Sequence, residues 1–136
     1  MQNQSTMNKV SYLILRLAIG LSAFGHGLVR LPKLEKFSNW MVGGFEKTML
    51  PKIIVLPFSY ILPVAEFLIG ILLIPGLFTK QAIYAGVTVM CILIFGTTLQ
   101  ENWEAIPTQL IHIAFFAVLF QFLDSNTISV DQLVKK

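Results

Sequence analysis

Long apolar runs separated by short polar segments make up most of the chain. Four runs approach the roughly 20 mostly apolar residues that a helix needs to cross a bilayer. They cover about residues 12–29, 53–74, 82–99 and 106–123, and the last is followed by Asp124-Ser125-Asn126. We therefore predict an all-α fold, an integral membrane four-helix bundle, as a single membrane domain over residues 1–136.

The connections between these runs constrain the topology. Residues 75–81 and 100–105 form connections so short that the helices they join must be antiparallel neighbours. Four spans place both ends of the chain on the same side of the membrane. Pro57 and Pro63 lie inside the second run, where we expect a kink, because membrane helices tolerate proline. The polar residues 124–136 are predicted to be a loose tail.

The first run resembles the apolar part of a signal peptide, but Arg16 interrupts it. No small-residue cleavage site of the A-x-A kind follows it, so we expect a retained helix.

The first connection, residues 30–52, is longer and amphipathic. Apolar residues recur in it at steps of three or four, with charged residues between them: Leu34, Phe37, Met41, Phe45 and Met49. This pattern is typical of an interfacial helix, here expected to break at Gly43-Gly44 and to hold Trp40 at headgroup depth. The alternative is an ordinary ordered loop that packs on the mouth of the bundle.

Composition supports the membrane assignment. Only 12% of residues are charged and 55% are hydrophobic, with a mean hydropathy of +0.73, whereas about a quarter of a soluble domain is charged. We expect the lipid bilayer to cover the apolar surface. The net charge of +3 comes from basic residues at the ends of apolar runs, so no nucleic-acid partner is expected. Cys91 is the only cysteine, which excludes an internal disulfide, a CxxC pair and a cysteine-based zinc site. We predict no metal site.

Four ionisable residues lie within the predicted spans: Arg16, His26, Glu66 and His112. Counting helical rise from the span ends places Arg16 and Glu66 at depths that a long side chain can bridge. We therefore predict a buried ion pair between them. One interpretation is that the pair only joins two helices. The other is that Glu66 carries protons or contacts a polar ligand, with Arg16 tuning its pKa.

The histidines belong to the other half of the membrane. His26 and His112 are predicted to lie at similar depths near the face opposite the termini. Together with three further polar residues they form a predicted ligand layer, consisting of His26, Thr97, Thr98, Gln109 and His112. Two histidines on different helices can hydrogen-bond a quinone, ligate a haem or bond backbone carbonyls. A quinone is a candidate cofactor, a haem is less favoured, and the layer requires no cofactor.

The first run also presents a face of small residues. Gly20, Ala23 and Gly27 align between Arg16 and Arg30 at 100° per residue, and small residues allow close helix packing in membranes. We predict that this face contacts a neighbouring helix.

Several of these elements resemble the DoxX family of small bacterial membrane proteins. The similarity lies in two groups of residues, the first being Arg16-Leu17, Gly25-His26-Gly27, Arg30 and Lys33, and the second Glu66, Gly70, Leu72-Leu73, Gly76 and Thr79-Lys80. The resemblance implies a four-helix bundle in the bacterial inner membrane, and we favour cytoplasmic termini on that basis. The side of the termini carries four lysine and arginine residues and the opposite side carries five. This difference decides little about orientation.

The resemblance also implies a link to redox metabolism. Some relatives are subunits of a thiosulfate:quinone oxidoreductase, and others associate with thiol or oxidative-stress proteins. We therefore expect a redox-associated accessory subunit close to a quinone pool, which is not an enzyme on its own. Its expected partners are other membrane proteins or further copies of the chain. One alternative is a structural or assembly partner without a ligand, and another is a small-molecule or proton pathway.

Overall fold

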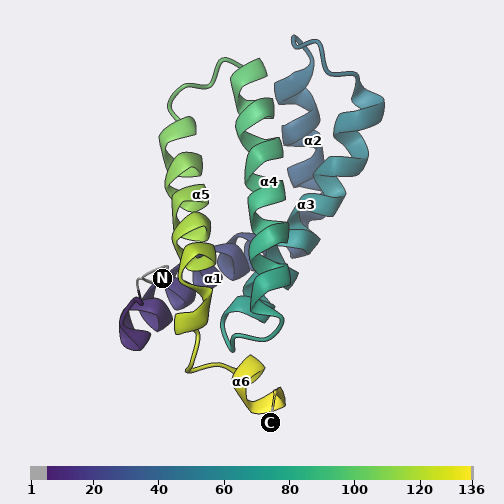
Figure 1. Cartoon of the computed structure of the whole chain (residues 1–136). Helices are drawn as coiled ribbons and strands as arrows, with labels where there is room; N and C mark the ends of the chain where they lie inside the picture. The colour runs from purple at the N-terminus through teal and green to yellow at the C-terminus, as the bar shows by residue number, and fades with distance from the viewer. Residues whose placement is uncertain (1–5, 136) are drawn as a thin grey trace.

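The structure, a computed structural model, describes residues 6–135. Within that range all regular elements are helical (Figure 1), which confirms the all-α prediction. In chain order they are α1 (Lys9–Arg30), η1 (Leu31–Lys33), α2 (Leu34–Phe45), α3 (Lys52–Leu73), α4 (Thr79–Leu99), α5 (Ile106–Gln121), η2 (Leu123–Ser125) and α6 (Val130–Val134). The four predicted apolar runs coincide with α1, α3, α4 and α5 to within one helical turn.

Three helical stretches of the described chain are long and apolar enough to cross a membrane. They are Lys9–Phe45, in which α1, η1 and α2 follow one another, Lys52–Leu73 and Thr79–Leu99. The apolar helix α5 has 16 residues, which gives it a length of about 24 Å against a hydrocarbon thickness of about 30 Å. Many large apolar side chains, among them Ile14, Ile53 and Phe95, are exposed. Lipid is the solvent suited to such a surface.

Helices α1 and α3 pack closely against each other at two glycines. A Cβ on Gly27 would lie 2.5 Å from the backbone nitrogen of Phe67, and one on Gly70 would lie 2.5 Å from the Cα of Phe24. Backbone atoms cannot move aside as a flexible side chain can. The absence of side chains at these two positions is therefore what allows the helices to approach so closely.

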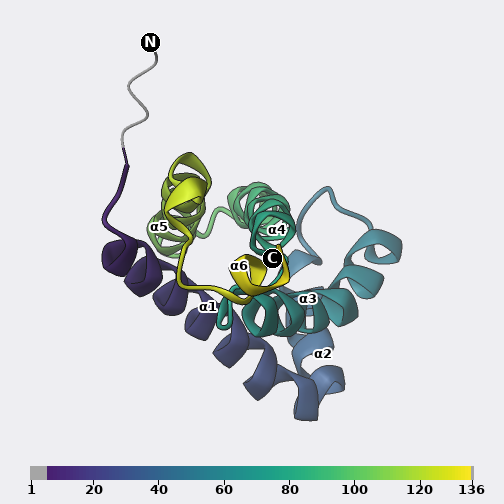
Figure 2. The same cartoon turned by 60° about the horizontal axis from the view of Figure 1, so that its bottom comes forward.

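The segment that follows α1 runs beside the N-terminal half of α3 (Figure 1). Figure 2 shows α1 crossing obliquely before the chain turns into α2 at η1, which contains Pro32. Ser38 of α2 is hydrogen-bonded to Ser59 of α3, with 2.6 Å between their hydroxyl oxygens, and Met41 belongs to the apolar cluster of Val55 and Leu62.

This arrangement bears on the predictions for the first connection. The first connection is helical from Leu31 to Phe45. Helix α2 continues through Gly43-Gly44 and ends at Phe45, so the predicted break at the glycines is not formed. Trp40 is 70% exposed. The interfacial position of this helix stays a prediction. Helix α3 likewise runs unbroken through Pro57 and Pro63.

Helices α4 and α5 form an antiparallel pair. The ring of Phe116 lies directly on Gly86, where a Cβ would be 2.5 Å from Cε1 of the ring. The main core lies where this pair meets α1 and α3, and its buried members are Tyr12, Ile19, Ile69, Leu73, Ala82, Ile83, Phe116 and Leu119. This core occupies the end of the bundle near the chain termini.

The two ends of the described chain lie at the same end of the bundle (Figure 1). The backbone N–H of Met7 donates to Ser125 Oγ at 3.1 Å, and the N–H of Val130 donates to the carbonyl of Pro75 at 3.1 Å. The prediction of a loose tail is therefore wrong for the residues up to Lys135, because η2 and α6 fold back onto the turn between α3 and α4. Met1 and Lys136 lie outside the described residues.

Candidate functional site

A large cavity lies between α1, α2, α3, α4 and α5. Its volume is about 660 Å³, and most of its wall is apolar. The apolar lining comes chiefly from α2, α3 and α4 and includes Phe37, Met41, Phe58, Leu62, Val89 and Leu93. Trp40 stands at the same wall and is largely exposed. Apolar residues surround α3 and α4 on nearly all sides, as is typical of membrane spans, so the side of each helix that faces the interior is apolar as well.

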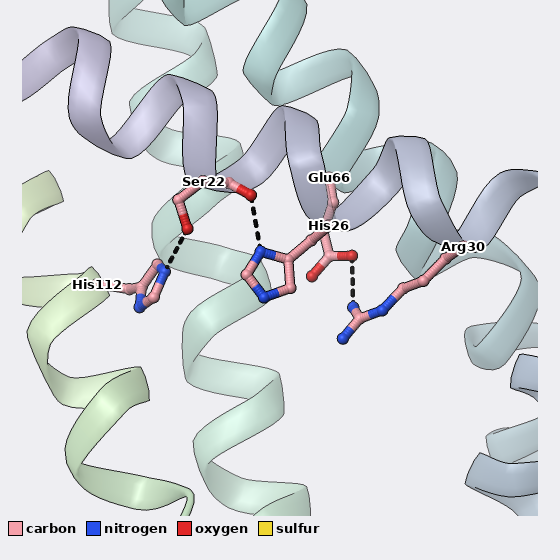
Figure 3. Close-up of polar contacts among 5 residues, drawn as sticks. All are labelled: Ser22, His26, Arg30, Glu66 and His112. Carbon is pink, nitrogen blue, oxygen red and sulfur yellow. Dashed lines mark hydrogen bonds and ion pairs between the residues drawn. The ribbon is translucent and has the colours of Figure 1, made fainter.

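One row of α1 brings polar groups to this apolar space. Ser22, His26 and Arg30 follow one another at intervals of four residues, so they lie on one face of the helix. Figure 3 shows this row together with Glu66 of α3 and His112 of α5. His26, Arg30, Glu66 and His112 all line the cavity.

Glu66 forms an ion pair with Arg30. Arg30 Nη1 lies 2.7 Å from Glu66 Oε2, and the two side chains are 25% and 8% exposed, respectively. The guanidinium of Arg30 also lies over the ring of Phe37, with its carbon 4.6 Å from the ring centroid. Arg30 is thus positioned by α1, α2 and α3 together. The sequence had indicated Arg30 as a basic residue after the first run and as part of the family resemblance, but not as the partner of Glu66.

The predicted ion pair between Arg16 and Glu66 is not formed. In the contact between α1 and α3, Gly27 lies opposite Phe67 and Gly20 lies against Leu73 and Ile74. This antiparallel register brings Arg30 level with Glu66 and carries Arg16 past the end of α3. The predicted pair assumed that the start of α1 and the end of α3 lie at the same face of the membrane. Helix α1 instead crosses α3 obliquely, and its first turns lie beyond the end of α3.

Arg16 instead holds the C-terminal segment. It is only 2% exposed, and it donates from Nη1 to Asn126 Oδ1 and from Nη2 to the carbonyl of Ile128, the latter at 2.9 Å. Asn126 in turn donates to Thr79 Oγ1 at 3.0 Å. Gly76 has a φ of 74°, and a Cβ on it would lie 2.7 Å from Arg16 Nη1, so this turn requires glycine for both conformation and space.

Asp131 completes this polar network by capping α4. Its carboxylate accepts the N–H groups of Phe78 at 2.7 Å and Thr79 at 2.9 Å, which are among the donors left without partners at a helix start. Burial opposes ionisation of Asp131, but the hydrogen bonds from Thr79 and Phe78 outweigh it and hold the pKa of Asp131 below its ordinary value. Sequence reasoning missed Asn126 and Asp131, because it assigned both to the tail.

The two histidines come close to each other across α1 and α5. Their ring centroids are 6.2 Å apart and the rings are nearly perpendicular. His26 Nδ1 lies 2.7 Å from the carbonyl oxygen of Ser22, and His112 Nδ1 lies 2.7 Å from that of Thr108. His112 Nε2 is 2.9 Å from Ser22 Oγ (Figure 3). Ser22 was missed by the sequence analysis, although its spacing of four residues from His26 pointed to it.

The rest of the predicted layer divides into two parts. Gln109 and Thr97 line the cavity and are joined by a hydrogen bond of 2.8 Å from Gln109 Nε2 to Thr97 Oγ1. Gln109 Oε1 is buried and has no partner among the described residues. Thr98 is exposed and donates its hydroxyl to the carbonyl of Ile94 in its own helix, so it does not join the layer.

The small residues predicted to pack occupy different positions. Gly20 and Gly27 lie against α3, whereas Ala23 packs beside the main core and also lines the cavity. No group of three metal-ligating side chains occurs among residues 6–135.

A comparison with protein families matches the DoxX family over residues 11–99. The chain belongs to the DoxX family. The match extends from the first turn of α1 to the end of α4, and it confirms the family resemblance seen in the sequence. No curated protein and no solved structure matches the chain. Together with the long apolar helices, membership identifies a multi-pass membrane protein. Gln109 and His112, which close the cavity from α5, lie beyond the matched residues.

Proposed function

We propose that this DoxX protein is an accessory subunit of a redox system in the bacterial inner membrane and that it binds a quinone-type ligand in the cavity. The termini would lie in the cytoplasm. The observation that carries the proposal is the composition of the cavity wall, which is apolar over most of its area and polar at His26, Glu66, Arg30 and His112. Such a wall matches a ligand with an apolar ring and tail and one polar edge.

The dimensions of the cavity support the same ligand class. Ligand pockets commonly measure about 300–1,000 Å³, with apolar walls and a few convergent polar groups, and this cavity of about 660 Å³ falls within that range. A haem is served less well, because His112 Nε2, a nitrogen able to ligate iron, is already hydrogen-bonded to Ser22. In this proposal the protein holds the ligand, and a partner protein supplies the electron transfer.

Ligand binding can be followed through Trp40, which lines the cavity. The protein has two tryptophans, so a Trp103→Phe background makes Trp40 the only indole. We expect a short-tailed benzoquinol, the hydroxyl-bearing reduced form of a benzoquinone, to quench Trp40 fluorescence saturably when it is titrated without oxygen. His26→Ala should weaken binding about fivefold, since a net hydrogen bond contributes about 1 kcal/mol. Thr88→Ala on α4 is the matched control, because the Thr88 hydroxyl only bonds the carbonyl of Tyr84.

Two results would contradict the ligand proposal. One is an absence of saturable quenching. The other is an unchanged affinity in both His26→Ala and His112→Ala combined with earlier thermal unfolding. The second result would favour a structural role, which has its own support in the bonds from both Nδ1 atoms to carbonyls of the same helix. Mass spectrometry of the gently solubilised protein tests the accessory role, since a redox protein should co-purify with it.

A further inference from the structure

The hydrogen bonds of the two histidines determine which ring nitrogens carry protons. A backbone carbonyl only accepts hydrogen bonds, so His26 Nδ1 must donate to the carbonyl of Ser22 and His112 Nδ1 must donate to that of Thr108. In a neutral imidazole, one nitrogen donates and the other accepts. Both Nε2 atoms are therefore acceptors when the rings are neutral.

The two acceptors differ in availability. His112 Nε2 accepts from the hydroxyl of Ser22 at 2.9 Å. His26 Nε2 has no hydrogen-bond partner among the described residues, and its side chain lines the cavity (Figure 3). The cavity therefore presents one unused nitrogen lone pair at its polar edge.

The wall of the same cavity also carries a donor. Arg30 lines the same wall and uses Nη1 to bond Glu66, which leaves further N–H groups of its guanidinium for a ligand. A hydroxyl group can donate to His26 Nε2 and accept from Arg30 at once. A carbonyl oxygen can only accept, so it would satisfy Arg30 and direct its own lone pairs at that of His26.

We infer that the site selects the hydroxyl-bearing form of its ligand, an aromatic quinol or phenol, over the carbonyl-bearing quinone, and that His26 determines this preference. The inference rests on the proposed function, since it specifies the ligand class of the same cavity. Ser22 has an indirect part in the selection, because it occupies His112 Nε2 and so leaves His26 Nε2 as the histidine acceptor for the ligand.

The test uses two ligands that differ only in their donor. A 4-alkylphenol and its methyl ether share the ring, the tail and the acceptor oxygen, and neither is altered by air as a quinol is. Their dissociation constants are measured by Trp40 quenching in the Trp103→Phe background at pH 8, where free imidazole is neutral. We expect the phenol to bind about fivefold more tightly, as for one hydrogen bond of about 1 kcal/mol. A benzoquinol and its benzoquinone, compared without oxygen, should show the same order.

Two variants should move this preference in opposite directions. His26→Phe keeps a ring but removes the acceptor. The dissociation constant of the ether divided by that of the phenol should therefore fall close to the value for a non-specific apolar site. Ser22→Ala frees His112 Nε2 as a second acceptor in the same cavity, so the ratio should rise. A difference in the hydrophobicity of the two ligands cannot produce opposite shifts. Thermal unfolding of both variants verifies that each is folded.

Failure of the hydroxyl preference and failure of ligand binding can be distinguished in this experiment. Equal affinities for the phenol and the ether in the wild-type site, or a preference that persists in His26→Phe, would overturn the inference and leave the ligand proposal standing. Failure of the quinone, the quinol and the phenol alike to quench Trp40 would overturn the proposed function and this inference with it.

Discussion

The ion pair between Arg30 and Glu66 can be tested by removing each partner alone and both together. Arg30→Gln leaves a carboxylate that is 8% exposed without its partner, whereas Glu66→Gln leaves a guanidinium that is 25% exposed and able to turn outward. The first change should therefore destabilise the protein more than the second. Glutamine matches the size of glutamate but is shorter than arginine, so Arg30→Gln also removes the contact of the guanidinium with the ring of Phe37.

The magnitude follows from the geometry of the pair. Two unit charges 4 Å apart attract by about 4 kcal/mol at an effective dielectric constant of 20, and removing one partner of a buried pair costs about 3–5 kcal/mol. Solvent screens the exposed quarter of Arg30, so we expect about 3 kcal/mol for Arg30→Gln and about 1 kcal/mol for Glu66→Gln. The double variant should lose about 1–2 kcal/mol, which gives a coupling energy of about 2–3 kcal/mol.

Denaturant unfolding in a mild detergent measures all four free energies. A second cycle, Arg16→Gln with Glu66→Gln, is the matched control, because Arg16 bonds Asn126 and Ile128 beyond the C-terminal end of α3 and not Glu66. Its two losses should be additive within about 0.5 kcal/mol. Additive losses for Arg30 and Glu66, or strong coupling between Arg16 and Glu66, would refute the register of α1 against α3.

Three further predictions address the helix contact, the C-terminal cap and the topology. Gly70→Leu should destabilise the protein by about 3 kcal/mol or abolish folding, because its Cβ would lie 2.5 Å from the Cα of Phe24, whereas Gly25→Ala, with open space around the new Cβ, should cost nothing in the same unfolding assay. Asp131 has a lowered pKa in the folded state, so its contribution to stability is present above its ordinary pKa of 3.8 and is lost as the pH falls through the lower folded value. The stability difference between wild type and Asp131→Asn should accordingly shrink on acidification in that range, and a difference that grows would contradict the cap. Reporter fusions at the C-terminus and beside Lys47 should report opposite compartments. Identical reports would mean that the chain between the two fusions crosses the membrane an even number of times.

The positions of the helices followed from the sequence, because hydropathy and helix-breaking residues act locally. The predicted runs matched α1, α3, α4 and α5 to within one turn, and the order of short elements between Arg16 and Lys80 identified the family. The sequence also indicated which ionisable groups lie inside apolar helices. His26, Glu66 and His112 all line the cavity, because a polar group in an apolar helix avoids lipid by facing the interior.

Which of these groups meet was decided by the tertiary structure. A sequence gives the depth of a residue only if the helices are parallel to a common axis and their ends lie at a common face. Helix α1 meets neither condition, because it crosses α3 obliquely and extends past its end. Arg30 therefore replaced Arg16 as the partner of Glu66, and Arg16 bonds Asn126, which is distant in the chain. The direction of the hydrogen bond at His26 likewise depended on where a carbonyl oxygen lies in space. Contacts of this kind depend on helix register and crossing angle, and those arise from the fit of glycines and side chains across an interface that no single helix encodes.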